Sequence, residues 1–376
     1  MKVLFTSVPA VGHLIPLLSL ARAAHAAGDD VVILAAGELR PLVGDLAFRE
    51  LPPGIEGLLA RNQELTSDDV MGFQIDDPAD RFLASTIAMF SSTRVDTSFD
   101  EAVRITAEEA PDLVVVDRGD YLGPVVASHF GIPWLFVDHS PATPVDSLLE
   151  EAMQTAASGL GVTVTPQIAT VRQWPEWLGA TQEWPGESID AQAGTFGETT
   201  VDPGTPTPDV RPGPVVLVTL GTVVDDLDLL RAAVEAVRGA GATAIVSTGL
   251  LPVETPAEFD DEQVRVHPFT PIAQLLEGAD AVVAAGGSGT TLAALSRGLP
   301  IAFVPRIANQ PIVAATVEQV GAGVVCADVT ELPDAVTAIL QDERLRRKAA
   351  EAARRLGERP SPDAAWSTVR DLVPAG

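Results

Sequence analysis

The chain has 376 residues, of which 46% are hydrophobic and 20% charged, so it carries enough apolar sequence for two globular domains and is not a disordered chain. Acidic residues outnumber basic ones by 52 to 24, and the formal net charge of −28 argues against nucleic acid or anionic lipid as a partner. The single cysteine excludes an internal disulfide, and no secretion signal or membrane span is visible, so we expect a cytoplasmic protein.

Apolar runs alternate with helical patterns along the chain. In the first half, runs rich in valine and leucine lie at Val3–Ser7, Val31–Ala36, Leu113–Asp117 and Trp134–Asp138. Such runs are typical of parallel strands that are buried on both faces. The same alternation restarts at Val215–Leu220. The sequence therefore predicts an α/β fold with two Rossmann-like, doubly wound parallel-sheet domains.

A proline-rich segment separates the two series. Residues 201–214 read VDPGTPTPDVRPGP, and their five prolines and two glycines disfavour a helix or a central strand. We therefore predict an interdomain linker at 201–214, a first domain over 1–200 and a second over 215–358. The last segment, 359–376, is predicted as a helix that can pack back on the first domain.

Two tryptophans, Trp174 and Trp177, lie in a tract of prolines and polar residues near the end of the first half. They have two interpretations of equal weight. Either their rings pack against the domain, or they form an aromatic wall that binds an acceptor.

A histidine follows the first predicted strand, in the segment VPAVGHLIPLL. Gly12 allows a tight turn, and His13 stands at the start of the next helix, in a loop that faces the ligand crevice of an open α/β sheet. An imidazole there can accept a proton near neutral pH, although a helix-capping role is the alternative. The loop matches neither G-x-G-x-x-G nor a P-loop, which weakens oxidoreductase and NTPase interpretations.

An acid ends the strand LVVVD. Asp117 can hydrogen-bond the imidazole of His13 and fix its tautomer, and Asp120, three residues later, is the rival for this role. A carboxylate that caps the loop is an equally good explanation of Asp117 from the residues alone.

The strongest local signal is the segment AGGSGTTLAALSRGLP, in which glycines and hydroxyls lie between a strand and a helix. The exposed N–H groups and the helix dipole predict an anion cradle, and a plain glycine turn is the alternative. The residues of the predicted cradle are Gly286, Gly287, Ser288, Gly289 and Thr290. Gly221 and Thr222, after the first strand of the second half, are expected to face the same crevice.

A metal site is not predicted. Asp226 and Asp228 spell D-x-D, which can chelate a divalent ion, but they stand at a helix start, where acids favour the helix dipole. The remaining histidines have no partner at metal-ligand spacing, so we expect core or surface roles for them: His25, His129, His139 and His267.

Six motifs together resemble a known family. GHLIPLL, LVVVD, VTLGT, HPFTPIAQLLEGAD, GGSGTTLAAL and RGLPIAFVPRIANQ are similar, in order and spacing over nearly the whole chain, to the bacterial GT-B glycosyltransferases that decorate macrolides, aromatic polyketides and enediynes. The resemblance implies that His13 is the catalytic base and that Asp117 orients it.

The resemblance also assigns the donor site. It implies nucleobase contacts from Phe269, Thr270 and Ile272, diphosphate contacts from Thr222 and the glycine cradle, and donor-sugar contacts from Asn309 and Gln310. Two positions depart from the family pattern, because Asn309 stands where the family has aspartate and Ala285 where it has histidine. Loss of that histidine removes one stabiliser of the leaving group.

The function that follows is an inverting, metal-independent transfer of a sugar or deoxysugar from a dTDP- or UDP-sugar to a small hydrophobic natural-product aglycone. The nucleotide sugar is a substrate, and no cofactor is expected. O- and C-glycosylation both fit, and a homodimer stays open. The alternatives are an auxiliary GT-B-fold binding protein with weakened catalysis, suggested by Ala285 and Asn309, and a nucleotide-sugar epimerase.

Overall fold

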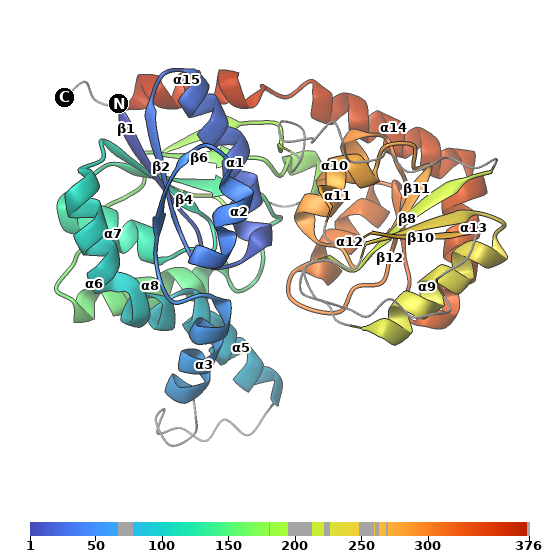
Figure 1. Ribbon diagram of the computed structural model, residues 1–376, viewed down its shortest axis with the longest axis horizontal. Helices are drawn as coiled ribbons and strands as arrows, with labels where there is room; N and C mark the ends of the chain where they lie inside the picture. The colour runs from blue at the N-terminus through green and yellow to red at the C-terminus, as the bar shows by residue number, and fades with distance from the viewer. Residues whose placement is uncertain are drawn as a thin grey trace. The chain divides into compact units, whose positions relative to one another are not determined.

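The computed structural model describes residues 1–66, 78–179, 181–194, 213–221, 226–247, 259, 263–267 and 270–373. The chain divides into two compact units. Unit 1 consists of Met1–Gln173, Gln182–Ala191 and Pro360–Gly376, and unit 2 of Trp174–Thr181 and Gln192–Arg359. Each unit contains one parallel sheet with helices on both faces, so the predicted pair of Rossmann-like domains is confirmed (Figure 1).

Unit 1 is built on a seven-stranded sheet with the order β3-β2-β1-β4-β5-β6-β7. Its strands are β1 (Lys2–Thr6), β2 (Asp30–Ala35), β3 (Ala47–Glu50), β4 (Leu113–Asp117), β5 (Trp134–Asp138), β6 (Ala169–Arg172) and β7 (Glu187–Asp190). Its helices are α1 (Val11–Ala26), α2 (Arg40–Val43), α3 (Ile55–Leu65), α5 (Pro78–Phe90), α6 (Ser92–Glu109), α7 (Leu122–Phe130), α8 (Asp146–Gly159) and α15 (Pro362–Leu372). All of the strand pairs are parallel.

Unit 2 is built on a six-stranded parallel sheet with the order β10-β9-β8-β11-β12-β13. Its strands are β8 (Val215–Thr219), β9 (Thr243–Ser247), β10 (Val264–His267), β11 (Ala281–Ala284), β12 (Ile301–Phe303) and β13 (Gly323–Val325). Its helices are α9 (Leu227–Gly239), α10 (Ile272–Leu275), α11 (Ser288–Ser296), α12 (Gln310–Gln319), α13 (Leu332–Gln341) and α14 (Glu343–Gly357).

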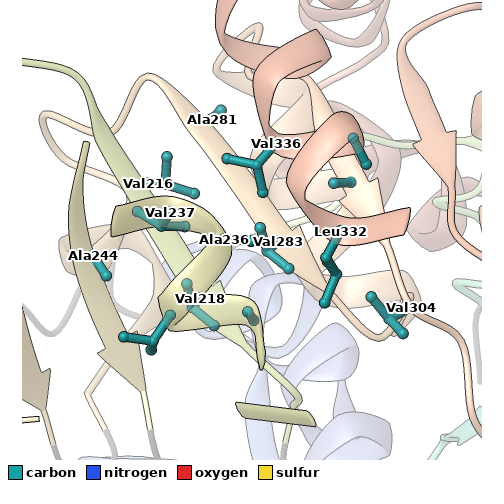
Figure 2. Packing of buried hydrophobic residues seen from close by; sticks show 14 of the residues in the cluster. Val216, Val218, Ala236, Val237, Ala244, Ala281, Val283, Val304, Leu332 and Val336 are labelled. Atoms are coloured by element: carbon teal, nitrogen blue, oxygen red, sulfur yellow. The ribbon is translucent and has the colours of Figure 1, made fainter. Parts of the chain in front are cut away.

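Strand β8 shows why continuous apolar runs were the correct strand signal. Successive side chains point to opposite faces of the sheet. Val216 and Val218 pack with α9 and α13 on one face, as Figure 2 shows, whereas Val215 and Leu217 pack with α11, α12 and α14 on the other. Because both faces are covered by helices, neither set of positions can be polar.

The strand order places one topological switch point in each unit. Strand β1 lies between β2 and β4, and β8 lies between β9 and β11. The connection that follows β1 therefore crosses one face of its sheet and the connection that follows β4 the other, and the same holds for β8 and β11. In open α/β sheets, ligands bind at the carboxyl ends of the strands at such a point. The predicted functional residues after β1, β4, β8 and β11 therefore lie at the sheet edges where ligand sites form.

The last helix, α15, belongs to unit 1 and packs along α1 (Figure 1). Trp366 is buried there, with its ring centroid 6.1 Å from that of Phe5. Its indole Nε1 donates a hydrogen bond of 2.8 Å to Asp29, so the polar edge of the buried ring is satisfied. Of the predicted linker, residues 201–212 lie outside the described residues.

The predicted acceptor wall is wrong for Trp174. Its side chain is 1% exposed and belongs to the hydrophobic core of unit 2, although we predicted this tract in the first domain. Trp177 is partly buried against the same core, and the guanidinium of Arg355 lies 4.1 Å from its ring centroid. An indole has a large apolar surface, so its burial in the core of unit 2 stabilises the fold more than exposure of the ring as a ligand contact would.

Candidate active site

His13 lies in the first turn of α1, directly after the carboxyl end of β1. The helix begins at Val11, and its N-cap residue, Ala10, makes no side-chain capping bond, so the imidazole is not a helix cap. The His13 side chain is 28% exposed. Its Nδ1 lies 2.8 Å from Oδ2 of Asp117, which is hydrogen-bond distance.

Asp117 is the last residue of β4 and is completely buried. Because β1 and β4 are adjacent and parallel, their carboxyl ends meet at one edge of the sheet, which brings together two residues 104 positions apart. The rival acid, Asp120, does not reach His13. It accepts hydrogen bonds from the Thr6 hydroxyl and from Arg94 Nε, so its place is in a buried ion pair beneath the site.

Gly119 was missed by the sequence interpretation. A Cβ atom built on this glycine would lie 2.6 Å from Cε1 and 2.7 Å from Nδ1 of His13, and 3.1 Å from Oδ2 of Asp117. Real Cβ atoms essentially never approach other heavy atoms closer than 3.0 Å. A side chain at position 119 would therefore occupy the space of the His13–Asp117 contact, and only glycine leaves it free.

His139, expected in a core or surface role, instead lies beside the pair. It follows β5, the neighbour of β4, and the register pairs Asp117 with Val137, which puts His139 at the same sheet edge. Its ring meets the His13 ring edge-on, with centroids 5.5 Å apart, and its Nδ1 lies 3.8 Å from Oδ1 of Asp117. No local signal marks this residue, because only the strand register brings it to the site.

The two histidines experience opposite electrostatic environments. Burial acts to lower the pKa of His13, but the charge of Asp117 and its hydrogen bond outweigh this effect and leave the pKa raised. His139 is more deeply buried and makes no hydrogen bond to Asp117, so burial lowers its pKa to about 4. At neutral pH His139 is therefore uncharged, because the charge of Asp117 does not offset its burial, whereas at His13 the charge and hydrogen bond of Asp117 do.

A buried ion-pair network joins the segments that follow β4 and β5, next to Asp117 and His139. Arg118 donates to Asp138 at 2.7 Å and also to Asp146. Burial raises the pKa of Asp138, which Arg118 opposes by its charge and hydrogen bond. Removal of one member would leave an uncompensated buried charge, so the network resists displacement of these segments.

In unit 2, the glycine cradle opens α11 at the carboxyl end of β11. Gly286 has φ of +101°, and a Cβ there would meet the backbone oxygen of Gln310 at 3.0 Å, so glycine is required by both conformation and space. Gly287 is the N-cap and Ser288 the first helical residue. Nothing lies within 4 Å of the Cβ positions of Gly287 and Gly289, so a ligand can approach the first-turn N–H groups, including that of Thr290.

The two predicted donor-sugar residues meet this cradle. Asn309 Nδ2 donates to Oγ of Ser288 at 3.3 Å. Gln310 begins α12, and its Oε1 accepts from the backbone N–H groups of Arg306 and Ile307 at 2.9 and 3.0 Å. The side-chain amide oxygen of Gln310 therefore stabilises the turn that holds Asn309 next to the cradle.

The other predicted donor contacts are described only in part. Gly221 follows β8 with φ of +83°, while Thr222 and Phe269 lie outside the described residues. Thr270 precedes α10, and Ile272 is its first residue and packs against the core of unit 2.

The two aspartates of the D-x-D motif make contacts within and around helix α9. Asp226 caps α9 by accepting from the Leu229 backbone N–H at 2.9 Å. Asp228 pairs with Arg231. Within the described part of the chain, the group of side chains close enough together to hold a metal ion is His13, Asp117 and His139.

Comparison with known proteins identifies the family. Residues 257–372 match the erythromycin biosynthesis protein CIII-like C-terminal domain. The elloramycin glycosyltransferase ElmGT of Streptomyces olivaceus is 30% identical over 383 residues, which cover 96% of this chain and 95% of that protein. The chain belongs to the bacterial antibiotic-biosynthesis glycosyltransferases. This glycosyltransferase therefore acts in natural-product glycosylation, as its motifs predicted.

Solved structures agree on the fold of this glycosyltransferase. The Streptomyces sp. SF2575 glycosyltransferase SsfS6, complexed with thymidine diphosphate, superposes with a TM-score of 0.82 at 24% identity and covers 99% of both chains. The spinosyn rhamnosyltransferase SpnG, complexed with spinosyn aglycone, gives 0.79 at 20% identity over 98% of this chain and 100% of that one. Both likenesses confirm the GT-B architecture. Among the described helices, none combines the length and apolar character needed to cross a bilayer.

Proposed function

We propose that this glycosyltransferase transfers a sugar or deoxysugar from a dTDP- or UDP-sugar to a hydroxyl of a hydrophobic natural product, with inversion, using His13 as general base. The observation that carries the proposal is the contact of 2.8 Å between His13 Nδ1 and a buried Asp117 carboxylate. A carboxylate at Nδ1 keeps the proton on that nitrogen, which leaves the lone pair on Nε2.

In the proposed step, the acceptor oxygen attacks the anomeric carbon as Nε2 of His13 takes its proton. The bond between that carbon and the phosphate oxygen breaks, and the nucleoside diphosphate leaves with the electron pair. A single displacement inverts the configuration. Asp117 stabilises the imidazolium that forms, and this agrees with the raised pKa of His13.

The α11 N-terminus is the proposed seat of the donor diphosphate. The chain has a net charge of −28, so a dianionic ligand needs local dipoles that outweigh the general repulsion. The helix dipole and the first-turn N–H groups beyond Gly287 provide them, with Asn309 placed beside Ser288 for the sugar. The thymidine diphosphate complex of SsfS6 supports a dTDP-linked donor.

The α5 helix supports a hydrophobic acceptor. The ring centroid of Phe90, its last residue, lies 5.6 Å from that of His13, and Phe82, two turns earlier, is 65% exposed. From Arg81 to Phe90 no residue is fully buried, although the segment is largely apolar. This helix exposes part of its apolar surface to solvent beside the proposed base, and such a surface suits a hydrophobic aglycone.

No cofactor is required by this proposal, and no metal takes part in the step. The nucleotide sugar is a substrate, and the helix dipole carries the stabilisation of the leaving group. Ala285 is 2% exposed and supplies no hydrogen bond from its side chain to the diphosphate. Loss of one charge-assisted hydrogen bond costs a few kcal/mol, so turnover on the order of a hundredfold below that of a histidine-bearing relative is expected.

The test is a turnover assay of His13→Ala with dTDP- and UDP-sugars across a panel of aglycones. We expect sugar transfer to fall by at least about a thousandfold while calorimetric affinity for dTDP stays within about threefold, because the base and the cradle belong to different units. His25→Ala, an exposed residue of the same helix, is the matched control. Undiminished turnover in His13→Ala would remove His13 as the base.

The alternative function, a GT-B-fold binding protein with weakened catalysis, predicts a different result for the unmodified protein. Because Ala285 and Asn309 depart from the family pattern, nucleotide binding without transfer to any aglycone of the panel would favour a binding role. Absence of dTDP and UDP binding would contradict the donor assignment itself.

A further inference from the structure

The Asp117 carboxylate has a second face that the proposed function does not use. Its Oδ2 meets His13, whereas its Oδ1 is buried and has no hydrogen-bond partner among the described residues. Across from it, at 3.8 Å, Nδ1 of His139 is also buried and makes no hydrogen bond of ordinary geometry there, although the backbone of Val137 acts on this ring as an acceptor. Two unpaired polar atoms that face each other in a buried site are costly unless something binds both.

The three side chains have the arrangement of a metal site. One ligand atom from each of His13, Asp117 and His139 lies within 4.8 Å of the others. Zinc binds imidazole nitrogen and carboxylate oxygen at about 2.0 to 2.2 Å, so two ligands of one ion lie about 3 to 4 Å apart. The separation of 2.8 Å between His13 Nδ1 and Oδ2 of Asp117 and that of 3.8 Å between His139 Nδ1 and Oδ1 lie on either side of this range. Because all three ligand atoms lie within 4.8 Å of one another, modest side-chain movements would bring them around one ion.

The chemistry of the ligands selects the kind of ion. Two imidazoles and one carboxylate suit zinc and its first-row neighbours, whereas magnesium and calcium prefer all-oxygen sites. The surrounding charge also favours a cation. Arg118 and Arg94 are positive groups near the site, and four acids outnumber them: Asp117, Asp120, Asp138 and Asp146.

We propose that His13, Asp117 and His139 form a binding site for a borderline divalent ion such as Zn²⁺, and that the bound ion inhibits this glycosyltransferase. Inhibition rests on the proposed function: an ion bound at Nδ1 of His13 moves the imidazole proton to Nε2, so Nε2 has no lone pair left to accept the proton of the acceptor hydroxyl. Binding itself does not rest on it. The site would open to solvent on the side of His13, which is the exposed member of the three.

The experiment measures Zn²⁺ binding to the full chain by equilibrium dialysis, without donor or acceptor. We expect one tight site per chain, weakened at least about tenfold in His139→Gln, since loss even of an outer partner of a metal ligand costs 10- to 100-fold in affinity. His129→Gln, an exposed histidine of the same unit, is the matched control and should bind as the parent does. Co²⁺ should give the intense visible bands of a four- or five-coordinate ion in the parent and lose them in His139→Gln.

The activity arm uses the same proteins. Zn²⁺ should inhibit sugar transfer by the parent and by His129→Gln, chelation should restore it, and His139→Gln should need at least about tenfold more Zn²⁺ for equal inhibition. Equal Zn²⁺ affinity in His139→Gln and the parent would overturn the inference, as would a six-coordinate Co²⁺ spectrum. If binding fails while His13→Ala still abolishes transfer, the base assignment stands and the metal site falls. If Zn²⁺ binds tightly while His13→Ala stays active, the metal site stands and the base assignment falls.

Discussion

Gly119→Ala is the sharpest test of the His13–Asp117 geometry, because it adds one methyl group at the contact itself. The new Cβ would start 2.6 Å from His13 Cε1, and ordinary contact begins at 3.4 Å, so the ring must withdraw by about 0.8 Å. A shift of that size away from Asp117 would stretch the hydrogen bond of 2.8 Å to about 3.6 Å, where it no longer counts as one.

The expected consequence is a loss of rate with little loss of fold. A misplacement of about 1 Å costs on the order of a hundredfold in turnover, or about 3 kcal/mol of transition-state stabilisation. We expect kcat to fall by that factor, with nucleotide affinity unchanged because the glycine cradle lies in the other unit. Initial rates with saturating donor and acceptor, together with calorimetry of dTDP binding, measure both effects.

Gly159→Ala is the matched control. This glycine ends α8, and nothing lies within 4 Å of its Cβ position, so the same substitution there should leave kcat unchanged. Thermal unfolding of both variants shows whether a lower rate reflects a lower folded fraction. Turnover of Gly119→Ala within about threefold of the parent, with an unchanged pH profile, would refute the claim that this contact positions the base.

Three further predictions concern the ionisable groups of unit 1. Asp117→Asn removes the charge that raises the pKa of His13, so the acidic limb of the kcat/KM profile, where activity rises as His13 loses its proton, should move to lower pH. Its plateau should fall by about 10² to 10⁴, and an unmoved limb would contradict the assignment. Asp120→Asn should move that limb in the same direction but by less, because the charge of Asp120 raises the pKa of His13 less than that of Asp117 does. It should also destabilise the fold by about 3 to 5 kcal/mol in urea unfolding, because the buried charge of Arg94 loses its partner. His139, with its pKa lowered to about 4, binds a proton more readily when unfolded, so its contribution to stability is lost as pH falls from about 6.5 to 4. His139→Gln should therefore lose up to about 3 kcal/mol less than the parent over this range, and parallel stability curves would exclude the effect.

The amino-acid sequence alone was sufficient for the apolar central strands and for the histidine and glycine segments that follow two of them, but it did not predict the short strands β3, β6, β7 and β13. A continuous apolar run such as Val215–Thr219 needs burial on both faces, and repeated alternation of such runs with helical patterns is typical of parallel strands covered by helices. The glycine turn before α11 can also be predicted from the sequence, because backbone freedom and exposed N–H groups are properties of a short segment. The position of His13 after the first strand follows from the same local logic.

Only the tertiary structure decided which side chains meet. Asp117 and Asp120 are equivalent in sequence, and the sheet edge turns the first toward His13 and the second toward Arg94. His139 carries no local signature and reaches the site through the register of β4 and β5.

Two further positions were equally invisible in the sequence. Gly119 is revealed by the His13 ring that fills its side-chain space. Trp174 was assigned to the wrong domain, because an aromatic ring is as suitable for a core as for a ligand wall, and only the path of the chain decides between them. Contacts of this kind depend on how parallel strands align over a hundred residues, and no local pattern encodes that alignment.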